Sequence, residues 1–475
     1  MKSLKKNILY NFIYQILVLI LPFITAPYLS RVIGAGGLGT YSLSQTIAQY
    51  FTYLTLLGLT NYGNREIARV QNDKEKRSRV FCEIYAMQLG CFVISCIIYA
   101  IYTVFFSVDF AAASIMWLWV ISAVFDINWF FFGMEQFKLT VTRNAIIKLT
   151  TVILIFVFVK DHNDTYKYIL IMAGGILASQ LCLWPFVKRF IDFQKPTWQG
   201  IKKHIKPNLV LFVPVIAISV YRLMDKVMIG YMASNTELGY YENAEKITTI
   251  ILTLVSAVGT VMLPRMSALI SDNNNETSKK YIDITMLIVI AYVNAAIYGI
   301  FAIGDPFCTL YFGEGFERTS LILKYLVVTV TFVGCGNVLR TQYLIPHKMD
   351  RIYINSALIG AGVNFTVNLI LIPLLSAVGA AIGTICAEVV VFLYQSISIR
   401  KAINFKLYIR QELLFLAIGA ASFGLYLLIP DSNNSIADIG IALAIGCVTF
   451  VPLTLFLLKQ KGLSFPKKKR SRKKE

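Results

Sequence analysis

The chain contains repeated apolar stretches that are each long enough to cross a lipid bilayer as a helix. About 20 apolar residues span the roughly 30 Å of hydrocarbon in a membrane, and such windows recur along the whole sequence. Hydrophobic residues make up 57% of the 475 residues and charged residues only 15%. Soluble domains carry roughly 25% charged residues. The sequence therefore predicts an all-α polytopic membrane protein.

We expect about fourteen transmembrane helices from the apolar windows. They are predicted near 7–30, 40–60, 81–107, 112–134, 141–160, 167–187, 209–233, 244–264, 283–304, 318–345, 352–372, 377–399, 408–430 and 436–458.

Lysine and arginine are distributed unevenly between the predicted loops. With the N-terminus inside, 35 of the 45 Lys and Arg residues fall in inner loops, including 135–143, and 4 fall in outer loops. This bias predicts that both termini are cytoplasmic. The basic segment 459–475 follows the last span directly, so we expect it to contact anionic membrane lipids and not nucleic acid.

Several motifs do not indicate soluble enzyme chemistry. The stretch "GAGGLG" at 34–39 follows a predicted span instead of a strand, so we interpret it as a hairpin loop and not as a dinucleotide site. The eight Cys and three His residues are dispersed, and no phosphate-binding loop occurs. We therefore expect no metal site, no cofactor and no enzymatic activity.

An offset of 200 residues superposes two parts of the chain. Positions 37–84 align with 237–284 without a gap and share ten identities, among them Gly39 with Gly239. Because six helices return the chain to the same side, this repeat predicts two parallel six-helix lobes with a transport pathway between them. The expected division is a lobe over 1–190, a cytoplasmic linker over 191–207, a lobe over 208–400, an extra helix pair over 401–458 and a basic tail over 459–475.

Three charges interrupt the predicted span at 209–233. Arg222, Asp225 and Lys226 are spaced i, i+3, i+4 and share one helix face. Asp225 can neutralise only one of the two cations, and a cation facing lipid costs several kcal/mol. The face is thus predicted to line a pathway for an anionic cargo, or alternatively to form a buried ion network that fixes packing.

Further polar residues within the predicted spans are candidates for the pathway. Two cations, Lys148 and Arg340, are functional hypotheses because they lie at membrane depth. The amides suit sugar hydroxyls, although bonding between helices is an equal alternative: Asn11, Gln15, Asn364 and Asn368. The candidates for ion coupling are Asp126, Asp225 and Glu388.

Successive stretches of the sequence resemble a known family. They include "LPFITAPYLSRVIGAGGLGTYSLSQTIAQYF" near the N-terminus, "DINWFFFGMEQFK", "MDKVMIGYM", "LGYYENAEKI" and "NSALIGAGVNFTVNLILIPLLSAVGAAIGTICAE". In this order they are similar to the bacterial polysaccharide-repeat-unit flippases (Wzx type) of the multidrug/oligosaccharidyl-lipid/polysaccharide exporter superfamily.

The resemblance implies a fold and a function. It implies two six-helix bundles plus a final pair, in the bacterial cell membrane, which move an undecaprenyl-diphosphate-linked oligosaccharide from the inner to the outer leaflet by alternating access. Polysaccharide polymerase and assembly proteins are implied as partners. The resemblance further places a set of charges on lobe surfaces that face the pathway: Arg31, Arg65, Arg222, Asp225 and Lys226.

Two alternatives remain at the level of sequence. An ion-coupled multidrug exporter of the same superfamily would more often use carboxylates for a cationic substrate, whereas the face around Arg222 is predicted to be net positive. A membrane-embedded glycosyltransferase or polymerase would need a catalytic acid or base and large external loops.

Overall fold

The computed structural model describes residues 2–272, 274–429 and 435–460, without the side chains of residues 2–19, 214, 217, 218, 220, 221 and 435. Throughout these described residues the regular structure is helical, without a strand. This confirms the predicted all-α class. The chain divides into two compact units, Met1–Glu242 and Asn243–Glu475.

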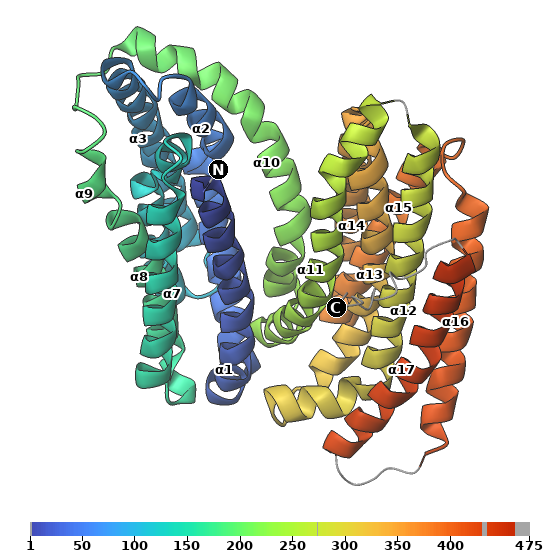
Figure 1. Ribbon diagram of the computed structural model, residues 1–475. Coiled ribbons are helices and arrows are strands. Elements are labelled where there is room, and N and C mark those ends of the chain that lie inside the picture. Colours follow the sequence, from blue (N-terminus) through green and yellow to red (C-terminus); the bar gives the residue numbers. More distant parts are fainter. Residues whose placement is uncertain (1, 273, 430–434, 461–475) are drawn as a thin grey trace, which may run out of the picture. The chain divides into compact units, whose positions relative to one another are not determined.

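The first unit contains the N-terminal helices and ends within α11 (Figure 1). Its elements are α1 (Lys2–Leu56), α2 (Leu59–Arg69), α3 (Lys74–Phe105), α4 (Phe110–Ile115), α5 (Trp117–Ser122), η1 (Ala123–Phe125), α6 (Asn128–Gly133), α7 (Phe137–Phe158), η2 (His162–Asp164), α8 (Thr165–Leu181), α9 (Trp184–Val187), α10 (Trp198–Met232) and the start of α11 (Asn235–Ser271).

The second unit continues from α11 through the C-terminal helices. Its elements are α12 (Asn275–Phe312), α13 (Glu317–Leu339), the π-helical turn η3 (Arg340–Leu344), α14 (Asp350–Leu375), α15 (Ala377–Ser398), α16 (Phe405–Leu427) and α17 (Ser435–Gln460). The helices α16 and α17 pack on each other and on α12, as the expected extra pair.

Ten helical segments of the described residues are long and apolar enough to cross a membrane. They coincide with ten of the predicted spans, and the protein is a multi-pass membrane protein. The other four predicted spans, 7–30, 40–60, 209–233 and 408–430, lie in α1, α10 and α16. The total of fourteen therefore stays a prediction.

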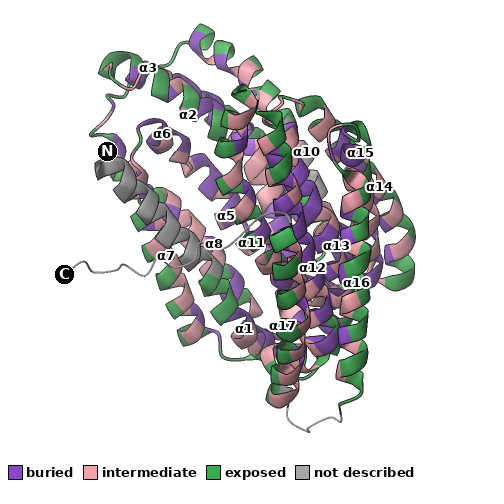
Figure 2. Ribbon diagram, turned by 45° about the vertical axis from the view of Figure 1, so that its right-hand side comes forward, coloured by how far each residue is buried: buried purple, intermediate pink, exposed green. Residues whose placement is uncertain are grey.

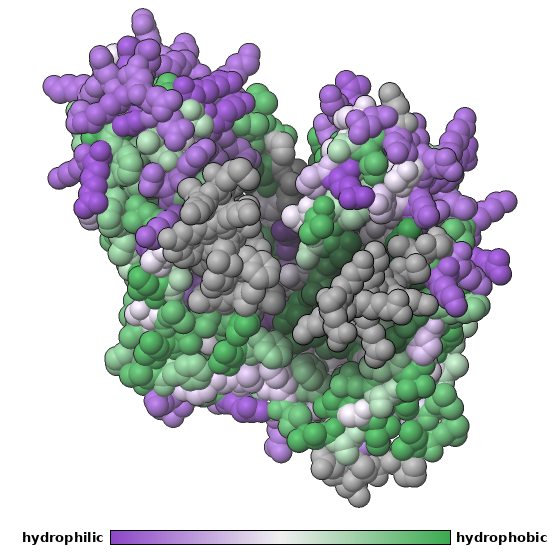
Figure 3. All heavy atoms as spheres, in the orientation of Figure 1, coloured by the Kyte–Doolittle hydropathy of each residue, from purple (hydrophilic) through white to green (hydrophobic). Residues whose placement is uncertain are grey.

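The distribution of burial fits helices in lipid. In the segment Glu317–Leu344, which comprises α13 and η3, 67% of the apolar window is buried, whereas in α7 only 11% is buried. Figure 2 shows the burial of each residue along these helices. On the visible face of the first unit, hydrophilic residues gather at the end where α2, α3 and α10 begin, and hydrophobic residues cover the flank (Figure 3). A flank of this kind suits contact with lipid tails.

The helix α1 is broken at Gly34, whose φ of 68° is left-handed. Its 55 residues would extend about 80 Å if straight, more than twice the hydrocarbon thickness. Each arm is long enough for one of the two predicted spans, 7–30 and 40–60. The expected loop over 34–39 is wrong in extent, because residues 35–39 are helical and the break is confined to Gly34. A β-carbon there would also press against His162, 2.5 Å from its Cε1 atom.

The second arm of α1 crosses the first turns of α11 at two glycines. A side chain on Gly39 would overlap the carbonyl of Asn235, and one on Gly239 would overlap the carbonyl of Ala35. The two contacts are related by the same offset of 200 residues that defines the repeat. Only glycine permits the two backbones to approach this closely.

Candidate functional site

The charged face of α10 meets the start of α11 across a short turn. Tyr241 donates a hydrogen bond of 2.9 Å to the buried Asp225 carboxylate. Lys226 Nζ lies 2.7 Å from Glu242 Oε2, and the two side chains are only 14% and 15% exposed. Ser42 of α1 donates to the same Glu242 oxygen at 2.7 Å. We name these five residues the α10–α11 cluster.

The α10–α11 cluster follows from the geometry of a helical hairpin. Asp225 and Tyr241 are sixteen residues apart, as are Lys226 and Glu242, and both pairs are centred on the turn between the helices. In two antiparallel helices, residues that lie two helical turns before and after the connecting segment face each other. The cluster therefore neutralises Lys226 with an acid from the next helix.

Arg222 differs from its two neighbours on the same face. It is exposed, and it forms no ion pair with the residues whose side chains the structure describes. Met232 ends α10 ten residues later, which places Arg222 about 15 Å from the helix end, near half the thickness of the hydrocarbon core. Arg222 is thus the exposed cation of this face, whereas Lys226 is paired with an acid.

The predicted span at 112–134 is not one continuous helix. It consists of four short elements, α4, α5, η1 and α6, and the backbone is extended at Asp126 with φ −75° and ψ 100°. Gln88 of α3 donates to the freed carbonyls of Ala123 at 2.8 Å and Asp126 at 3.0 Å, and it accepts from Trp129 Nε1 at 3.1 Å. Irregular backbone at membrane depth needs such partners.

A buried arginine stands beside this helix break. Arg143 of α7 donates to Ser179 O at 2.8 Å and to Asn128 Oδ1 at 3.0 Å. Asn128 in turn donates to Asp126 Oδ1 through its backbone at 3.0 Å and through its side chain at 2.7 Å. The predicted coupling acid Asp126 is therefore held in a polar network among α6, α7 and α8.

The remaining candidates of the first unit lie at separate positions. Arg31 is exposed near the end of the first arm of α1, and Lys148 is half-buried on α7. Arg65 is exposed on α2, with its guanidinium 5.5 Å from the Tyr62 ring centroid. Asn11 and Gln15 lie in α1, but their side chains are outside the described residues.

The candidates of the second unit are mostly shielded. Asn364 and Asn368 are buried on α14, joined by a hydrogen bond of 3.3 Å, and Asn368 packs against Gly383 of α15. Glu388 is half-buried on α15. Arg340 occupies the π-helical turn, where its guanidinium lies 5.3 Å from the Tyr353 ring centroid.

A buried acid also anchors the first turns of α10. Glu83 of α3 accepts from Lys203 at 2.6 Å and lies 3.3 Å from His204 Nε2. Burial raises the pKa of Tyr62 to about 12, so its hydroxyl stays protonated and donates to His204 Nδ1 at 2.6 Å. Burial lowers the pKa of His204. The neutral histidine thus bridges α2 and α3.

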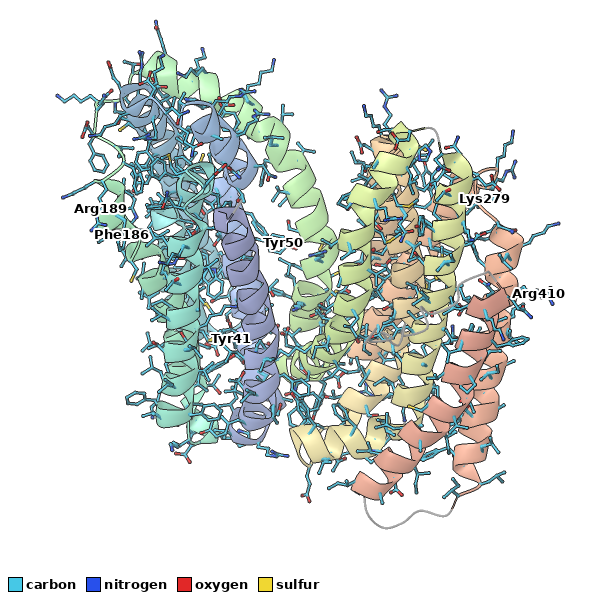
Figure 4. The ribbon with its side chains drawn as sticks, in the orientation of Figure 1. Tyr41, Tyr50, Phe186, Arg189, Lys279 and Arg410 are labelled. Carbon is cyan, nitrogen blue, oxygen red and sulfur yellow. The ribbon has the colours of Figure 1, made fainter. Side chains whose placement is uncertain are left out.

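A contact of α1 with α10 lies two helical turns from Ser42 along α1. Tyr50 of α1 (Figure 4) donates to Ser219 O of α10 at 3.4 Å, and Tyr41 packs on Tyr168 with ring centroids 4.7 Å apart. The second arm of α1 is therefore in contact with both α8 and α10.

Two charged residues of these networks were missed by the sequence reasoning. Glu242 lies just before the predicted span 244–264, and Arg143 was assigned to the inner loop 135–143. The structure places Arg143 inside α7, which begins at Phe137. The sixteen-residue spacing from Lys226 could have indicated that Glu242 is its partner. No sequence pattern indicated that Arg143 is buried within a helix.

Comparison with known proteins identifies the family. The family described as "Polysaccharide biosynthesis protein" matches residues 4–270, more than half of the chain. The chain belongs to this family. The chain is 22% identical to a putative O-antigen transporter of Escherichia coli (strain K12) over 401 residues, which cover 82% of this chain and 95% of the relative.

The chain is also similar to a flippase of an archaeon and to a solved flippase structure. It is 23% identical over 245 residues to a probable low-salt glycan biosynthesis flippase, Agl15, of Haloferax volcanii, covering 52% of this chain and 51% of the relative. Among solved structures, the lipid II flippase MurJ in an inward closed conformation is 13% identical with a TM-score of 0.75, covering 96% of this chain and 99% of MurJ.

A second solved structure shares the fold more loosely. An inward-facing multidrug resistance MATE family transporter of the MOP superfamily is 14% identical with a TM-score of 0.54, covering 81% of this chain and 98% of the transporter. The chain therefore has the fold of MurJ and of MATE transporters.

Proposed function

We propose that the protein is a flippase that moves an undecaprenyl-diphosphate-linked oligosaccharide repeat unit from the inner to the outer leaflet by alternating access, for export of a surface polysaccharide. The family membership supports this proposal, as do relatives that are named as transporters or flippases of O-antigen and glycan. The protein is proposed to act as a transporter and not as an enzyme.

The observation that carries the proposal is the exposed cation Arg222 on the α10 face. Lys226 is paired with Glu242, and Asp225 accepts from Tyr241, whereas Arg222 is exposed near mid-membrane depth. A cation costs several kcal/mol when it faces lipid. An anionic diphosphate beside Arg222 would remove this cost, whereas a cationic drug would increase it.

The remaining expectations belong to the same proposal. The pathway is proposed to lie between two six-helix lobes, 1–190 and 208–400, in a bacterial plasma membrane, with polymerase and assembly proteins as partners. The proposed pathway residues are Arg31, Arg65, Lys148, Arg222, Asp225, Lys226, Arg340, Asn11, Gln15, Asn364 and Asn368. The proposed coupling acids are Asp126, Asp225 and Glu388.

A reconstituted assay tests the cargo. Proteoliposomes that contain the full chain are loaded with a fluorescent undecaprenyl-diphosphate-linked disaccharide, and dithionite reports the fraction in the outer leaflet. We expect protein-dependent flipping of this lipid but not of a matched lipid with a neutral linkage. Because a charged hydrogen bond contributes about 1.5–3 kcal/mol, Arg222→Gln should slow flipping about ten- to hundredfold.

Two outcomes would contradict the proposal. One is flipping of the neutral lipid at the same rate as the diphosphate-linked lipid, which would show that the diphosphate is not recognised. The other is transport of ethidium with no flipping of either lipid, which would favour the multidrug exporter.

The proposed orientation has its own test. Reporters inserted in the α2–α3 loop at 70–73 and after Gly315 should be cytoplasmic and external, respectively. An external reporter at 70–73 would reverse the orientation.

A further inference from the structure

A carboxyl group that forms no ion pair among the described residues lies between α12 and α16 in the second unit. Asn294 of α12 is 2% exposed, and its Nδ2 donates to Glu412 Oε1 of α16 at 3.1 Å. The second hydrogen of this amide goes to Ile290 O at 2.9 Å. Glu412 Oε2 and Asn294 Oδ1 are both shielded from solvent, and neither finds a hydrogen-bond partner among the described residues.

Within the part of the chain that the structure describes, Glu412 forms no ion pair with a cation. Arg410 of the same helix is exposed and projects away from the helix pair (Figure 4), as expected for a residue two positions from Glu412. Tyr408 donates instead to Asp283 Oδ1 of α12 at 2.6 Å. The thiol of Cys335, on α13, is the other titratable group in electrostatic contact with Glu412. Tyr408 and Cys335 supply no positive charge, and Arg410 points away from Glu412 (Figure 4).

The two unsatisfied atoms have a simple geometric relationship. Each shares a carbon atom with one of the two atoms that are already bonded, so a planar arrangement brings carboxyl and amide edge to edge. In that arrangement Glu412 Oε2 and Asn294 Oδ1 are both acceptors and repel each other. One proton between them would convert this repulsion into a second hydrogen bond, because a protonated carboxyl is a donor.

A proton fits this site better than a metal ion. Hard metal ions such as calcium and magnesium take about six or more oxygen ligands, whereas the Glu412–Asn294 pair offers two unsatisfied oxygens. Among the described residues, no group of three or more His, Cys, Asp or Glu side chains could hold a metal. An ionised carboxylate that pairs with neither a cationic side chain nor a metal ion would be strongly unfavourable in this apolar setting.

We propose that Glu412 and Asn294 form a proton-binding site. With the proton bound, Glu412 donates to Asn294 Oδ1 while Asn294 Nδ2 donates to Glu412 Oε1. Loss of the proton leaves two acceptors facing each other and separates α16 from α12. The movement is passed to α17, because Ser422 of α16 donates to Thr449 of α17 at 2.9 Å. This site goes beyond the proposed function and does not depend on the cargo.

Carbodiimide labelling tests the site in the full-length protein. Dicyclohexylcarbodiimide reacts with protonated carboxyl groups in apolar surroundings, and mass spectrometry locates the adduct. In lipid nanodiscs we expect an adduct on Glu412 at neutral pH. Its yield should fall about tenfold for each pH unit above the midpoint, because the protonated fraction does so. Sodium chloride at constant ionic strength should not protect the site, and the exposed Glu276 should give no adduct.

The outcomes separate a proton site from its alternatives. Absence of an adduct at every pH would overturn the proposal, and so would protection by sodium at constant pH, which indicates a metal ion. A second measurement uses Glu412→Gln, whose amide can donate to Asn294 Oδ1 as the protonated acid does. This variant should fold normally. Its melting temperature should change less with pH than that of the wild type, because the titrating carboxyl group is absent. An unchanged pH dependence would contradict the proposal whether or not the protein is a flippase.

Discussion

Substitution of Glu242 by Gln distinguishes charges that hold the α10–α11 cluster from charges that serve transport. Glu242 Oε2 lies 2.7 Å from Lys226 Nζ and accepts from Ser42 Oγ at 2.7 Å. At an effective dielectric constant of about 20, the attraction across this distance is about 6 kcal/mol before desolvation. Desolvation of both ions offsets most of this attraction, so the intact pair contributes little net stability.

Loss of one partner has a larger effect than loss of the pair. A buried charge that loses its partner costs about 3–5 kcal/mol. Because the two side chains are still 14% and 15% exposed, we expect Glu242→Gln to destabilise the protein by about 3 kcal/mol, at the low end of that range. The double variant Lys226→Gln with Glu242→Gln removes both charges, and it should recover most of this loss.

The assay combines thermal unfolding of the full-length protein in nanodiscs with membrane abundance and flipping per molecule. Arg222→Gln is the matched control, because Arg222 is exposed and a surface substitution changes stability by less than about 0.5 kcal/mol. It should keep its abundance and lose flipping, whereas Glu242→Gln should lose abundance. Unfolding of Glu242→Gln at the wild-type temperature, or a double variant as unstable as the sum of the singles, would refute this reasoning.

Three further predictions concern the first unit. Gly34→Ala should lower membrane abundance because its φ of 68° is left-handed, whereas Gly90→Ala, which meets no atom within 4 Å, should not; equal abundance of the two would contradict this. Gln88→Leu should lower stability by about 1–3 kcal/mol, measured by thermal unfolding, because buried carbonyls at the helix break lose their donor. Burial lowers the pKa of His204 below 6.5, so the unfolded chain binds the proton first as the pH falls. Stability should therefore decrease from about pH 6.5 downwards in the wild type and less so in His204→Gln, and identical pH profiles would exclude His204 as the cause.

The apolar windows predicted helix positions well because lipid leaves the backbone no other partner. A chain in hydrocarbon must satisfy its amide groups within the segment, so a long apolar window forms a helix. Interruptions were harder to predict. The break at Asp126 depends on Gln88 from another helix, which supplies the donor for the freed carbonyls. No pattern within 112–134 contains that information.

The candidate site was predicted as a set of residues but not as a set of pairs. The spacing of Asp225 and Lys226 correctly placed them on one helix, whereas the partner Glu242 depends on how α10 and α11 pack across their turn. Arg143 was missed because span boundaries are uncertain by several residues, and its position six residues inside α7 lies within that uncertainty.

The glycine crossing of α1 and α11 has the form of a symmetric dimer contact within one chain. In a two-fold dimer, residue i of one subunit touches residue j of the other, and j touches i in return. Here Gly39 meets Asn235 while Gly239 meets Ala35, so each repeat offers the other the same two positions. Such reciprocity is what a duplicated gene inherits when its ancestor assembled as a homodimer. The contact then constrains both copies alike, because a side chain gained at either glycine meets the other repeat's backbone.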